Sequence, residues 1–136
     1  MLLQIDGKEF EFKIDFNFIR YFDKKLGTGL NNMKTTTNEV MLHTVEALVG
    51  RDPVVLADII EAGTYKRNPK PTKQEIEEYI VNGGEEVDEL YSDFFDYLTE
   101  DSILKNAYSQ VMKILENSQD GKKTQEEMAR QLLLNQ

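Results

Sequence analysis

The spacing of apolar residues changes once along this chain, from every second residue to every third or fourth, and this change limits the possible folds more than any other feature. Asp6-Gly7 is a two-residue turn signal, because a type I′ turn needs positive φ at both central positions. Such a turn pairs Leu3 with Phe10 across a β-hairpin. One hairpin face is then apolar, with Leu3, Ile5, Phe10, Phe12 and Ile14. A lone hairpin is marginal in water, so we expect this face to pack on helices.

From residue 15 onward the apolar spacing is helical, and start and stop signals divide the chain into helices. Asp15 or Asn17 can cap the first helix, and Asp52-Pro53 is a cap followed by a first-turn proline. Capping boxes, in which side chains bond the free amides of a helix start, are predicted at Thr36, Thr72 and Thr124. Glycines are expected to end helices at positions 27, 50 and 63.

The last core helix is expected after a joint at residues 99–102, and seven apolar residues are expected to face inward: Ile103, Leu104, Ala107, Tyr108, Val111, Met112 and Leu115. Together these signals predict an α+β fold that is mostly α, with an N-terminal β-hairpin packed on a bundle of about five to six helices. Residues 1–117 would form the hairpin and the helical body. Residues 118–136 would form a polar linker and a short amphipathic tail helix.

The predicted tail helix has Met128, Leu132 and Leu133 on one side. A helix of about ten residues is marginal alone, so these side chains need a surface to dock on. That surface could belong to this body, to another copy or to a partner groove. We interpret the three residues as candidate partner-binding residues.

Negative charge is concentrated in residues 74–104, which contain eleven carboxylates and no Lys, Arg or His. This block accounts for the net charge of −9, because the flanking parts are nearly balanced. Nucleic acids and anionic membranes are disfavoured as partners, since their phosphates would be repelled. Five acids form a helical face centred about 130° from the apolar stripe, which predicts a solvated surface. They are Glu86, Glu89, Asp93, Asp96 and Glu100.

Two aromatic residues in the acidic block have positions that leave their role open. Phe95 lies at the edge of the apolar stripe, and Tyr97 lies between the stripe and the acids. Either ring could belong to the core or could be an interface anchor, because aromatic side chains supply contact area at low entropic cost. We include both among the candidate partner-binding residues.

No set of residues indicates catalysis, a cofactor or a metal site. The absence of cysteine excludes disulfides, thiolate catalysis and Cys-based zinc sites. His43 is the single histidine and has no second ligand-type partner in register, so it is interpreted as structural. The start of the chain does not have the form of a signal peptide, and no segment is long and apolar enough to span a membrane. A reducing cytoplasm is the expected location.

Three stretches, taken in order and at their spacing, resemble a known family. They are residues 5–10 continuing through 15–27, residues 52–60, and residues 70–80. Together they resemble tail assembly chaperones of long-tailed bacteriophages of Gram-positive hosts. The resemblance implies a small, mostly helical, non-enzymatic protein of the host cytoplasm, absent from the finished virion. It implies binding to the tape measure protein, recruitment of tail tube subunits and possible homo-oligomers.

Two other classes of function stay open at this point. One is an acidic protein-binding module that mimics DNA and inhibits a DNA-binding protein. Its acids would span about 21 Å of helix, which is short for such a mimic. The other, which fits less well, is a metal-dependent enzyme built on the acidic block.

Overall fold

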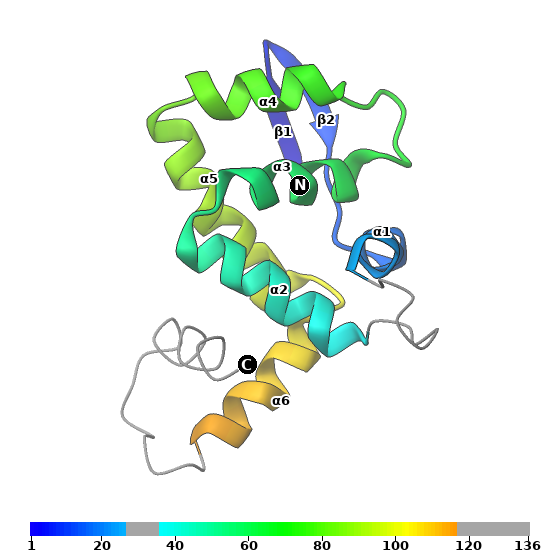
Figure 1. Ribbon diagram of the computed structural model, residues 1–136, viewed down its shortest axis with the longest axis vertical. Helices are drawn as coiled ribbons and strands as arrows, with labels where there is room; N and C mark the ends of the chain where they lie inside the picture. Colours follow the sequence, from blue (N-terminus) through cyan, green and yellow to red (C-terminus); the bar gives the residue numbers. More distant parts are fainter. Residues whose placement is uncertain (27–35, 117–136) are drawn as a thin grey trace.

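The computed structural model of the protein describes residues 1–26 and 36–116. Within these ranges a two-stranded antiparallel hairpin precedes six α-helices and one π-helix, which confirms the predicted α+β, mostly α fold. The hairpin and the last helix lie at opposite ends of the long axis of the molecule (Figure 1). The elements are β1 (Leu2–Ile5), β2 (Lys8–Glu11), α1 (Phe16–Leu26), α2 (Thr37–Gly50), α3 (Pro53–Thr64), α4 (Lys73–Asn82), α5 (Glu85–Asp96), the π-helix η2 (Tyr97–Asp101) and α6 (Lys105–Glu116).

The hairpin has the predicted turn and register. Asp6 and Gly7 have φ of +53° and +73°, as a type I′ turn requires, and Leu3 pairs with Phe10. All five residues of the apolar face are buried. The hairpin contacts α3 through β2 and α4 through β1, so its apolar face completes the helical core.

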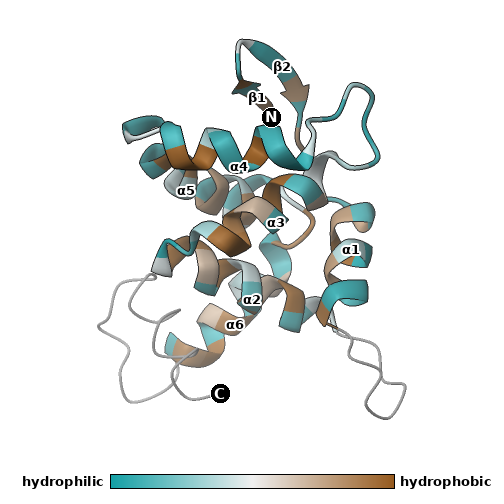
Figure 2. Ribbon diagram, turned by 45° about the horizontal axis from the view of Figure 1, so that its top comes forward, coloured by the Kyte–Doolittle hydropathy of each residue, from teal (hydrophilic) through white to brown (hydrophobic). Residues whose placement is uncertain are grey.

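Helix α3 is central to the helical body. It contacts α1, α2, α4 and β2, and Figure 2 shows it hydrophobic over most of its length. Asp52 caps its start, because the carboxylate accepts hydrogen bonds from the amides of Val54 and Val55 at 2.9 and 3.2 Å. The helix continues through Gly63 to Thr64, one residue beyond the expected end. Gly63 instead permits close packing, because a Cβ there would overlap the ring of Phe12.

The end of α2 differs from the expected glycine stop. Gly50 is the last helical residue, and Arg51 takes the left-handed conformation with φ of +53°. A non-glycine residue in this region is strained, and side-chain contacts offset the strain here. The guanidinium of Arg51 donates to the carbonyl of Asp88 at 3.0 Å and lies 5.4 Å from the ring centre of Tyr91. The end of α2 is therefore tied to α5.

The capping box at the start of α4 is complete. The hydroxyl of Thr72 accepts from the amide of Glu75, and the carboxylate of Glu75 accepts from the amide of Thr72, both at 3.1 Å. We expect Thr72→Ala to lower the free energy of unfolding by about 1 kcal/mol, measured by urea denaturation. Thr72→Ser keeps the hydroxyl and is the control. Equal losses in both variants would contradict the capping role.

The predicted joint between the last two core helices is formed by the π-helix η2 and by Ser102, which follows its last residue, Asp101. The Ser102 hydroxyl donates to the carbonyl of Leu98 at 2.6 Å and accepts from the amide of Leu104 at 3.1 Å. These bonds turn Leu104 fully into the core and leave Ile103 46% exposed. The expectation that Ile103 is a core residue is therefore wrong.

Candidate partner-binding surface

Two glycines set the angle at which the acidic block turns from α4 into α5. A Cβ on Gly83 would overlap the side chain of Val87, and Gly84 has φ of +52°. Helix α5 then packs on α2. Its inward side is buried and apolar, with Val87, Leu90, Tyr91 and Phe94. The opposite side of α5 is left facing solvent.

The five acids of the predicted face are all exposed, from Glu86 on α5 to Glu100 on η2. Their carboxylates therefore carry little desolvation cost. Two cations from outside the block reach it. Arg51 contacts α5 as described above, and the ammonium of Lys8 lies 3.2 Å from the carboxylate of Glu75. The surface is thus anionic, with cationic contacts at its edges.

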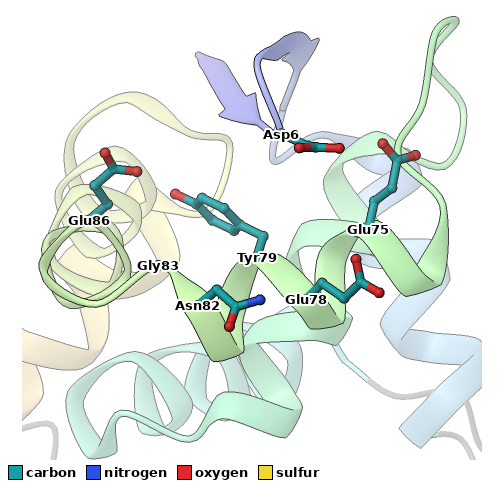
Figure 3. A pocket seen from close by; sticks show the side chains of 7 residues that line it. All are labelled: Asp6, Glu75, Glu78, Tyr79, Asn82, Gly83 and Glu86. Carbon is teal, nitrogen blue, oxygen red and sulfur yellow. The ribbon is translucent and has the colours of Figure 1, made fainter.

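A hollow of about 250 Å³ lies where the hairpin turn meets α4 and α5. Figure 3 shows Tyr79 in its middle, with Glu86 on one side and Asp6 on the other. Burial, and then the charges of Glu86 and Asp93, raise the pKa of the Tyr79 phenol. The residues lining the hollow are Asp6, Glu75, Glu78, Tyr79, Asn82, Gly83 and Glu86.

Glu75 is the carboxyl of the hollow that neighbouring donors stabilise in its ionised form. The amide of Thr72, and then the ammonium of Lys8, hold the pKa of the Glu75 carboxyl below its usual value. Sequence patterns did not reveal this hollow, because Asp6 comes from the hairpin turn, far from α4 in the chain. The Asp-Gly motif predicted the turn but not which residues of α4 and α5 lie opposite Asp6.

Metal ligation has no support in the described residues. No group of three or more His, Cys, Asp or Glu among residues 1–26 and 36–116 could hold a metal ion. His43 is half-buried, with its ring centre 5.7 Å from that of Phe22. This aromatic contact gives the histidine a packing role within the helical body.

The candidate anchors Phe95 and Tyr97 are both half-buried. The ring of Phe95 meets that of Tyr108 on α6 edge to face at 5.8 Å. The ring of Tyr97 meets that of Phe12 at 6.1 Å. Each ring therefore packs inside the protein and leaves only part of its surface beside the acidic face. The candidate tail residues Met128, Leu132 and Leu133 lie outside the described residues.

Comparison with protein families identifies the family of this chain. A family model described as phage tail assembly chaperone protein, TAC, matches residues 2–127. The chain belongs to this family. The match covers the hairpin, every described helix and the first part of the segment that follows α6. No curated protein and no solved structure matches the chain.

Membership confirms the resemblance to phage tail assembly chaperones, although not the kind of host, and sets the general role, which is assistance in phage tail assembly. Membership in a chaperone family implies a non-enzymatic role, and the family description points to phage tail proteins as partners. None of the described helices of this chaperone has the length and apolar character needed to cross a membrane.

Proposed function

We propose that the protein binds the tape measure protein and helps to recruit tail tube subunits during tail morphogenesis, without catalysing a reaction. The observation that carries this proposal is the family match over residues 2–127. The same match favours the chaperone role over a DNA mimic or a metal-dependent enzyme. The protein would act in the host cytoplasm, in several copies along the tape measure, and would be absent from the finished virion.

The charge distribution supports a chaperone role in which the protein keeps its bound partner soluble. A long helical tape measure has apolar surface that must be masked until the tube closes around it. The apolar part of such a partner helix would lie beside α5, against the exposed edges of Phe95 and Tyr97 and the tail residues Met128, Leu132 and Leu133. The acidic face would stay in solvent, where its charge keeps the loaded complex soluble by repulsion. It would also steer a basic partner toward this side.

Charge reversal on α5 tests the proposed orientation. We expect Glu89→Lys, Asp93→Lys and Asp96→Lys together to slow association with the tape measure protein by about tenfold at low salt, because steering depends on local charge. The measurement is surface plasmon resonance at several salt concentrations. The control, Glu9→Lys with Glu11→Lys and Glu46→Lys, changes the net charge equally on exposed residues elsewhere.

Two results would count against the proposal. Equal slowing by both triple variants would show that net charge matters and that the acidic face does not. The direct test is co-purification with the tape measure and tail tube proteins of the same phage. No complex with either protein, at low salt and micromolar concentration, would overturn the proposed function.

A further inference from the structure

The turn between α4 and α5 contains the single Asn-Gly pair of the chain, Asn82 followed by Gly83. Asn82 is the last residue of α4, and Gly83 follows it with φ of −78° and ψ of −16°. Packing requires the glycine, because a Cβ at position 83 would overlap the side chain of Val87 and lie 2.7 Å from the carbonyl oxygen of Tyr79. The main-chain nitrogen that follows Asn82 therefore has no side chain beside it to shield it.

The side chain of Asn82 is open to reaction. It is exposed to solvent and lies on α4 at the edge of the hollow around Tyr79 (Figure 3). Its carboxamide makes no hydrogen bond with another of the residues that the structure describes. The carbonyl carbon of the side chain, Cγ, is thus neither buried nor held in place by a hydrogen bond.

The last turn of α4 can open while the body stays folded. Val81 is 80% exposed and Asn82 is exposed as well, so packing holds this end of the helix weakly. The buried residue of α4 is Ile76, which lies nearer the start of the helix. Helix ends fray, and such opening releases Asn82 from its helical backbone angles. The nitrogen of Gly83 can then reach Cγ of Asn82.

We propose that Asn82 is a site of spontaneous covalent modification by water in the folded protein. The nitrogen of Gly83 forms a bond to Cγ of Asn82, the bond from Cγ to Nδ2 breaks, and ammonia leaves with the proton that the Gly83 amide gives up. Water then opens the cyclic imide at one of its two C–N bonds and yields aspartate or isoaspartate. The reaction needs no oxidant, metal or second protein, in keeping with the thermolability of asparagine.

Both products change the surface where α4 turns into α5. Either one adds a carboxylate one helical turn after Glu78, at the edge of a hollow that Glu86 also lines. Isoaspartate also lengthens the main chain directly before Gly83 and Gly84, the two residues that set the direction of α5. The inference concerns the protein without any partner, so it stands apart from the proposed function.

Incubation of the full-length protein in neutral buffer, followed by trypsin digestion and mass spectrometry, tests this proposal. Trypsin releases residues 74–105 as one peptide, in which Asn82 is the only asparagine. We expect Asn82 to convert about tenfold faster than Asn38 or Asn106, because neither of these exposed residues precedes a glycine. Labelling with a protein isoaspartate methyltransferase identifies isoaspartate in the peptide.

Asn82→Gln is the matched variant, because glutamine keeps the amide but must close a larger ring, which forms more slowly. The labelling of residues 74–105 should disappear in this variant, and Asn38 and Asn106 should react as before. Equal rates at Asn82, Asn38 and Asn106 in the folded protein would overturn the proposal. Conversion of Asn82 only in protein unfolded by urea would overturn it as well, because α4 would then protect this residue.

Discussion

The Phe12→Ala variant is expected to lose about 3–5 kcal/mol of free energy of unfolding. Phe12 is fully buried, and its ring stacks on that of Phe94 with centres 4.4 Å apart. It also meets the rings of Phe18 on α1 and Tyr97 on η2 edge to face, at 6.3 and 6.1 Å. One side chain from the end of the hairpin therefore joins three elements, and its removal leaves a cavity that none of them can fill alone.

Chemical denaturation followed by circular dichroism measures this loss. Phe16→Ala is the matched control, because Phe16 is the same residue type nearby and is 68% exposed. Its free energy of unfolding should change by less than about 0.5 kcal/mol. Similar losses in the two variants would show that the hairpin is not anchored through Phe12.

Gly63→Ala is expected to destabilise the protein by about 1–3 kcal/mol, although alanine favours helices more than glycine does. The added methyl group would overlap the ring of Phe12, which its aromatic neighbours hold in place. The backbone cannot easily move away, because the carbonyl of Gly63 accepts a hydrogen bond from the amide of Lys13 at 3.1 Å. Crowding therefore outweighs helix propensity at this position.

Gly50→Ala provides the contrast for Gly63→Ala. A Cβ at position 50 has no atom within 4 Å, so alanine there should stabilise α2 by up to about 0.5–1 kcal/mol. Combining Gly63→Ala with Phe12→Leu should cost less than the sum of the two single changes, because leucine leaves room for the methyl group. Additive losses, or a stable Gly63→Ala protein, would contradict close packing between α3 and the hairpin.

Patterns confined to a few neighbouring residues predicted much of this fold. The turn at Asp6-Gly7 set the strand register, and the caps at Asp52 and Thr72 set two helix starts. These features depend on hydrogen bonds between residues two to five positions apart. The solvent exposure of the acids on α5 was predicted from the helical spacing of the apolar residues, which is also a local pattern.

One wrong core assignment lies directly after the π-helix η2. The π-helix η2 has a wider turn than an α-helix, and the hydrogen bonds of Ser102 to Leu98 and Leu104 set how the chain leaves it. The apolar spacing predicts both Ile103 and Leu104 in the core, and of these two only Leu104 is buried.

The amino-acid sequence alone determined the hairpin, the helix starts and the placement of the acids on one face of α5. Short-range hydrogen bonds and the spacing of apolar residues specify these features. Three other features depend on contacts between segments far apart in the chain. They are the packing of Gly63 against Phe12, the left-handed conformation of Arg51 and the hollow around Tyr79. Side-chain volume, strain and charge act across those contacts. Only the tertiary structure, in which the hairpin and the helices pack around one core, decides these contacts.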